Sequence, residues 1–85
     1  MSSNKEETAA TIQARLDVLT KSLVSEENSV QYYQTLMEKT PQDSEENIGT
    51  GRMYEDLCEE EKGHVQVIQN LISHWEKQLA GIKNA

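Results

Sequence analysis

Apolar residues recur at alternating intervals of four and three residues along two long stretches of this sequence. The first stretch contains Ile12, Leu16, Leu19, Leu23, Glu26, Val30, Tyr33 and Met37, and the second contains Tyr54, Leu57, Glu61, His64, Ile68, Leu71 and Trp75, with Leu79 and Ile82 extending it. This spacing places each set on one side of an α-helix and is typical of helices packed in a left-handed bundle. The sequence therefore predicts an all-α fold of two amphipathic helices. We call the line of listed residues on each helix its seam; the seam is apolar except at Glu26, Glu61 and His64.

Capping residues and the single proline indicate where the first helix begins and ends. The capping box Ser3-Asn4-Lys5-Glu6 would start the helix near residue 4, and Thr8 is an alternative start. Thr40-Pro41 should end it near Lys39, because proline disfavours a helical conformation in the residue before it. The first helix is therefore expected over about 4–39.

A second capping signal, Asp43-Ser44-Glu45-Glu46, predicts another helix over about 44–80. Gly49 and Gly51 would either weaken its first turns or delay its firm start to Thr50, and Gly81 lies near its expected end. The short connection predicts an antiparallel helical hairpin, with the whole chain, 1–85, forming a single domain.

The chain is small for a protein that must bury its own core. It has 85 residues, 35% of them hydrophobic, and no phenylalanine. Chains of this size usually need a disulfide, a metal or oligomerisation for stability. Its single cysteine, Cys58, cannot form an internal disulfide and is expected to be a small buried hydrophobic residue, so metal binding and oligomerisation remain.

Charge and hydropathy narrow the classes of partner. Fifteen acidic and eight basic residues give a net charge of -7, which disfavours binding to nucleic acid or anionic membranes. No apolar run approaches the roughly 20 residues of a membrane span, and the N-terminus lacks the apolar core of a signal peptide. We therefore expect a soluble, cytoplasmic protein.

Three ionisable residues, Glu26, Glu61 and His64, interrupt the two apolar seams. Burying a carboxylate without a partner costs several kcal/mol, and neither seam contains a lysine or arginine to neutralise it. A bound cation is the simple solution, whereas a hydrogen-bonded Glu61–His64 pair is the alternative without metal. Glu27 replaces Glu26 as the predicted ligand if the register of the first helix is shifted by one residue.

The spacing of these residues matches half of a di-iron site. Such a site in a four-helix bundle uses one glutamate from each of two helices and a Glu-x-x-His motif from each of the other two. This chain offers Glu26 and Glu61-Lys62-Gly63-His64, so a twofold homodimer would complete both the bundle and the site. The prediction is two metal ions per dimer, one per chain, with iron favoured and manganese or another divalent ion as alternatives.

These residues resemble the rubrerythrin and ferritin-like superfamily over roughly residues 16–75. In that family a ligand glutamate is followed seven residues later by a tyrosine, as Glu26 is by Tyr33, and the next helix carries a segment similar to Glu60-Glu61-Lys62-Gly63-His64. The resemblance implies a ferritin-like bundle with Glu26, Glu61 and His64 as iron ligands. Tyr33 is expected to hydrogen-bond to a ligand carboxylate.

Within that superfamily the chain is most similar to the two-helix encapsulated ferritins, which assemble their ferroxidase site between subunits. That branch has a Trp-Tyr pair where this chain has Tyr32-Tyr33, and an acidic residue where this chain has Asn28. Its members form rings and act inside an encapsulin shell, to which a C-terminal tail directs them. No evident tail follows Ile82.

Other aromatic and histidine residues have structural interpretations. Tyr32 and Tyr54 are expected to pack, Trp75 to be a core or interface anchor, and His74 to lie on the surface.

The functional hypothesis from the predicted metal ligands and the resemblance is a ferroxidase that oxidises Fe(II) for storage or detoxification. The alternatives are a non-catalytic dimer stapled by metal and a metal-free helical adaptor.

Overall fold

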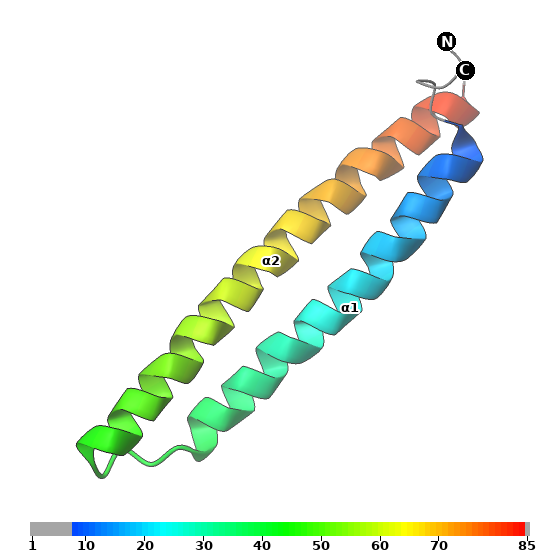
Figure 1. The fold of residues 1–85 in the computed structure, drawn as a ribbon. Helices are drawn as coiled ribbons and strands as arrows, with labels where there is room; N and C mark the ends of the chain where they lie inside the picture. The colour runs from blue at the N-terminus through cyan, green and yellow to red at the C-terminus, as the bar shows by residue number, and fades with distance from the viewer. Residues whose placement is uncertain (1–7, 85) are drawn as a thin grey trace, which may run out of the picture.

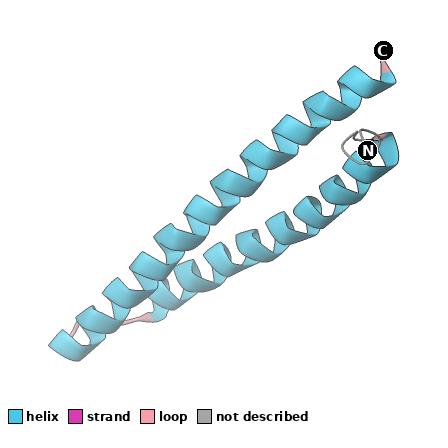
Figure 2. Ribbon diagram, turned by 45° about the horizontal axis from the view of Figure 1, so that its top comes forward, coloured by secondary structure: helices cyan, strands magenta, loops and turns pink. Residues whose placement is uncertain are grey.

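A computed structural model describes residues 8–84, in which two long helices run side by side and antiparallel (Figures 1 and 2). α1 spans Ala9–Lys39 and α2 spans Glu45–Lys83. The first turn of α1 and the last turn of α2 lie at the end of the hairpin opposite the connection. The all-α, two-helix prediction is confirmed for this range, and neither helix has an apolar stretch that could cross a membrane.

Side-chain caps explain where both helices begin. The Thr8 hydroxyl accepts a hydrogen bond from the Thr11 amide at 3.1 Å, so the alternative start is the one observed; the capping box at 3–6 lies outside the described residues. Ser44 accepts from the Asn47 amide at 3.0 Å and caps α2 in the same way. Each cap satisfies an amide that has no partner within the helix.

The glycines of α2 do not interrupt it. The helix begins at Glu45 and continues through Gly49 and Gly51, so the delayed start at Thr50 is not observed. The predicted end near residue 80 is wrong by three residues, because Gly81 stays helical and α2 reaches Lys83. No described glycine has a positive φ angle, so Gly81 does not form the left-handed cap that often ends a helix.

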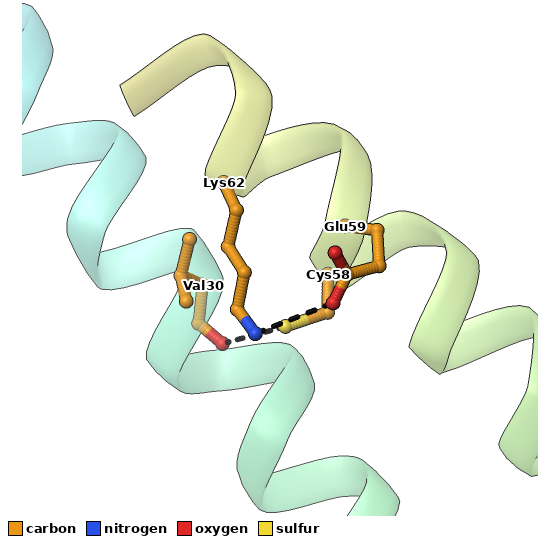
Figure 3. Close-up of polar contacts among 4 residues, drawn as sticks. All are labelled: Val30, Cys58, Glu59 and Lys62. Carbon is orange, nitrogen blue, oxygen red and sulfur yellow. Dashed lines mark hydrogen bonds and ion pairs between the residues drawn. The ribbon is translucent and has the colours of Figure 1, made fainter. Parts of the chain in front are cut away.

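The hairpin is a single thin layer with a small core. It measures about 62 × 22 × 14 Å, and the buried hydrophobic residues of the described range are Ile12, Leu16 and Cys58. The Cys58 thiol lies across the seam from α1, with its Sγ 3.8 Å from the Val30 carbonyl oxygen (Figure 3), which confirms the expected burial. Stable domains usually pack two or more layers around a core, and this hairpin supplies one.

The inward line of α2 differs from the predicted seam. His64, Leu71 and Ile82 were predicted to lie in the seam but are exposed, whereas Val65 and Ile72 are half-buried. His64 and Leu71 belong to one line of residues spaced seven apart on α2, and Cys58, Val65 and Ile72 belong to the adjacent line; Ile82 lies on neither and stands one residue before the end of the helix. Contact with α1 alone turns the line through Cys58 and Val65 inward and leaves the line through His64 and Leu71 on the flank of the hairpin.

Candidate metal centre

Glu26, Glu61 and His64 converge near the middle of the hairpin. Glu26 projects from α1, while Glu61 and His64 lie three residues apart on α2, a spacing that places both on one side of a helix. One potential ligand atom from each residue lies within 4.8 Å of the others. The His64 Nδ1 atom is 3.6 Å from Glu26 Oε2 and 3.8 Å from Glu61 Oε1. The structure thus brings together the three residues that the sequence selected.

The three side chains differ in their exposure to solvent. The side chains of Glu26 and Glu61 are 29% and 22% exposed, and that of His64 is 60% exposed. The two carboxylates therefore face one another between the helices, while the imidazole lies on an open flank. His64 still reaches the carboxylates because Glu61 is its neighbour one helical turn away.

One oxygen of Glu26 lacks the partner that its burial demands. When both glutamates are ionised, Glu26 Oε2 is shielded from solvent and accepts no hydrogen bond within residues 8–84. His64 Nδ1, at 3.6 Å, is too distant to form one. A buried acceptor without a partner costs about 1–3 kcal/mol, and more when it is charged, so native structures rarely retain one. A cation held by the three side chains would remove this cost.

Apart from His64, no basic side chain in residues 8–84 forms an ion pair with Glu26 or Glu61. Lys62, the neighbour of Glu61, instead pairs with Glu59, with 3.3 Å between Nζ and Oε1, and both of these side chains are largely exposed (Figure 3). The negative charge of the two glutamates is therefore not neutralised by a lysine or arginine of the described chain.

The metal-free site favours the protonated form of Glu61. Its pKa is raised above the ordinary value of 4.5, chiefly by the hydrogen bond with the Glu26 carboxyl and then by desolvation and the negative charge of Glu26. The Glu60 charge acts in the same direction, whereas His64 lowers the pKa. Two carboxyl groups that share a proton are a common response to crowded negative charge. Divalent metal would compete with that proton.

This pKa predicts how the stability of the metal-free protein depends on pH. The folded chain holds the Glu61 proton more tightly than the unfolded chain, so this contribution is present at low pH. It is lost as pH rises from 4.5 through the raised pKa. We expect the melting temperature of the metal-free protein to fall with pH over this window, and Glu61→Gln to flatten the fall. Thermal unfolding followed by circular dichroism at several pH values tests this.

The matched control is Glu59→Gln, which removes an exposed carboxylate from the same helix and should leave the slope unchanged. An unchanged slope in Glu61→Gln would show that another group is responsible.

Two tyrosines near the site lie outside the cluster. Tyr33 is half-buried, and within residues 8–84 its hydroxyl makes no hydrogen bond with Glu26, Glu61 or His64, contrary to expectation. It lies two turns from Glu26, roughly 10 Å along the helix axis, which is too far for direct contact. Tyr32 was expected to pack but is exposed, and its ring meets that of Tyr33 edge-on at 5.5 Å.

The alternative ligand Glu27 lies away from the cluster. Glu27 is exposed and lines a groove with Lys62 and Val65 on the flank opposite His64. The register that places Glu26 in the seam is therefore the one observed.

A stacked cluster near the open end of the hairpin was not foreseen. The Arg15 guanidinium lies 4.2 Å from the centre of the Trp75 ring, and His74 meets that ring edge-on at 4.7 Å. Trp75 is half-buried and His74 exposed, as predicted, and Tyr54 is half-buried. The sequence feature that could have indicated this contact is the position of Arg15, which lies three residues after Ile12 and therefore beside the seam.

The donor set of the cluster suits a divalent metal that prefers oxygen. Two carboxylates and one imidazole are ligands that iron and manganese use, whereas structural zinc sites are usually closed by four protein ligands rich in cysteine and histidine. Three protein groups would leave coordination positions open to water or a reactant.

No protein-family model, curated protein or solved structure matches this chain.

Proposed function

We propose that this protein binds Fe(II) through Glu26, Glu61 and His64 and that two chains together form a di-iron ferroxidase site. The observation that carries this proposal is the convergence of two partly buried carboxylates and an imidazole with no lysine or arginine partner in residues 8–84. The buried Glu26 Oε2 also supports the proposal, because a cation would satisfy this acceptor when both glutamates are ionised.

The small core and the incomplete ligand set both favour a site shared between two chains. One chain supplies two glutamates and one histidine, which is half of the ligand set of a carboxylate di-iron centre. Two chains would supply four carboxylates, whose charge balances two divalent ions when both imidazoles are neutral. The exposed side of His64 is where a second set of ligands can approach. Larger rings and association with an encapsulin shell stay predictions.

In the proposed reaction Fe(II) is the substrate. The glutamates bind and orient two ferrous ions, and each ion gives one electron to dioxygen. Dioxygen takes up these two electrons and two protons and leaves as hydrogen peroxide, while the iron leaves as Fe(III). The carboxylates of Glu26 and Glu61 supply the negative charge that favours the ferric product, and the His64 imidazole completes the protein ligands of each ion. The product suits iron storage or detoxification.

An anaerobic Fe(II) titration followed by exposure to air tests this function. We expect saturation near one iron per chain and then rapid growth of ferric absorbance, faster than the autoxidation of the same iron in buffer. The mass of the complex, measured with and without iron, should correspond to at least two chains.

Other outcomes would assign a different function. Tight binding without accelerated oxidation would identify a metal that only stabilises a helical dimer. The absence of specific binding would identify a metal-free adaptor. Tight binding by a single chain would exclude the shared site.

A further inference from the structure

Three grooves follow one another along the flank of the hairpin opposite His64. The first lies at the connection, the second beside the metal cluster and the third at the open end, with volumes of about 350, 340 and 360 Å³. Thr20 of the third groove and Glu27 of the second are seven residues apart on α1. Glu55 of the first groove and Lys62 of the second are seven residues apart on α2, so the grooves share one side of the hairpin. We call this side the groove flank.

Apolar side chains form the floor of the three grooves. They are Leu16, Val30 and Met37 of α1 and Val65, Ile72 and Leu79 of α2. Leu16 is buried and the other five are half-buried, so a partner could bury them further. Within each helix the floor residues are seven or fourteen residues apart, which is the spacing at which the side chains of packed helices interlock.

The length of this floor fits a helix. Met37 lies 21 residues after Leu16 on α1, about 32 Å along the axis at roughly 1.5 Å per residue, which is the length of a helix of three heptads. A groove between two helices is a surface into which an amphipathic helix can pack. Two exposed apolar side chains beside the floor would also be covered. Ile48, 39% exposed, lines the first groove, and Val24, 54% exposed, lies seven residues before Gln31 of the second.

The rows of residues that rim the grooves carry an excess of negative charge. Two rows on α1, through Thr20 and Gln31, and two on α2, through Arg52 and Lys62, repeat every seven residues and have members in the grooves. Together they contain seven acidic and three basic residues, all exposed, a net charge of -4 out of -7 for the whole chain. The acidic residues are Asp17, Glu27 and Glu38 of α1 and Glu45, Glu55, Glu59 and Glu76 of α2, and the basic residues are Arg52, Lys62 and Lys83.

The flank that carries His64 has no such excess. Its rows through Val18 and Ser22 on α1 and through His64 and Val67 on α2 contain two acidic and two basic residues within the two helices. The negative surface charge of the hairpin is therefore concentrated on the groove flank.

This charge selects the kind of helix that fits. Lys62 already pairs with Glu59, so one of the three basic side chains of the groove flank is engaged within the chain. A second copy presenting the same flank would set one excess of negative charge against another, which disfavours pairing. A helix with lysine or arginine on both sides of an apolar stripe would complement the floor and the rims together.

We propose that the groove flank binds a basic amphipathic helix of another protein. Aliphatic side chains of that helix, spaced by three and four residues, pack on the apolar floor, and its lysine and arginine side chains face the acidic rims. This interaction goes beyond the proposed function. It leaves the side of the metal cluster that carries His64 uncovered, so the partner helix and the second set of iron ligands can bind at the same time.

A synthetic peptide of three heptads tests the inference, with leucine at positions a and d, lysine at e and g and alanine elsewhere. Titrated into the full chain and followed by calorimetry, it should bind with one peptide per chain. The same peptide with glutamate in place of lysine should bind at least about 10-fold more weakly, because its charge matches that of the rims. Equal binding of the two peptides would overturn the inference.

Charge reversal on the chain locates the binding surface. Glu27→Lys combined with Glu55→Lys should weaken binding of the lysine peptide by about 10-fold and strengthen binding of the glutamate peptide. Glu46→Lys combined with Asp56→Lys is the matched control, because both residues are exposed, lie outside the groove flank and change the net charge equally. An equal loss in both variants would show general attraction to an acidic protein and overturn the inference.

Native mass spectrometry distinguishes a partner helix from a second copy on this flank. The peptide should add to the existing assembly, whereas displacement of a chain by the peptide would place a second copy in the grooves and overturn the inference. His64→Ala should leave peptide binding unchanged. A chain that binds the peptide but no iron would support this inference and overturn the proposed function alone. A chain that binds iron but no peptide would do the reverse.

Discussion

Replacing His64 by alanine should lower the affinity for Fe(II) by on the order of 100-fold or more and leave the hairpin folded. Losing a group that only supports a metal ligand typically costs 10- to 100-fold in affinity, so losing the imidazole itself should cost at least the upper end of that range. His64 is 60% exposed, so its removal creates no cavity between the helices. Anaerobic titration measures the affinity, and circular dichroism measures the helix content.

Glu27→Gln is the control for this result, because Glu27 is a neighbouring exposed carboxylate on the opposite flank. It should bind Fe(II) as the unmodified chain does. If His64→Ala and Glu27→Gln weaken binding equally, general negative charge rather than a defined site attracts the metal. Unchanged binding in His64→Ala would contradict the proposed ligand set.

Ile12→Ala should destabilise the metal-free protein by about 2–5 kcal/mol, the usual cost of this truncation in a core. Ile12 is 0% exposed, and the hairpin has only Leu16 and Cys58 as further buried hydrophobic residues in the described range. The loss is a large fraction of the total stability of a small domain. Urea unfolding at a fixed chain concentration, followed by circular dichroism, measures the change.

Val24→Ala serves as the comparison, since Val24 is 54% exposed and its truncation should change stability by no more than about 0.5 kcal/mol. A small effect of Ile12→Ala would mean that the packing around Ile12 contributes little and that stability comes from elsewhere in the assembly.

Most of the fold was predictable because its determinants are local. The seam spacing identified two helices, and Ser44 and Pro41 marked the connection between them. The end of α2 was not predictable from Gly81, since a glycine ends a helix only when it adopts the left-handed conformation, and here it does not. The spacing of apolar residues could not show whether the side of α2 that carries His64 or the side that carries Val65 contacts α1, because either side is compatible with the same helix.

The three residues of the site were predictable because Glu26, Glu61 and His64 are ionisable residues at positions where the seam is otherwise apolar. Glu26 and Glu61 are partly buried where the spacing placed them, and the three-residue step brings His64 to them. The position of His64 on the flank could not be read from the sequence, because it depends on which surface of α2 contacts α1. The stacking of Arg15 on Trp75 was missed for the same reason: it joins residues far apart in the chain.

The thinness of the hairpin has a consequence for how activity scales with the amount of protein. Under the proposed arrangement a layer of two helices would hold the ligands of one metal ion, so a lone chain would have no second ion with which to reduce dioxygen. Iron oxidation would then rise faster than in proportion to chain concentration until the pairs are saturated. Dilution below the dimer dissociation constant would abolish iron oxidation. A chain that lacks its ligands would also inactivate the intact chain with which it pairs.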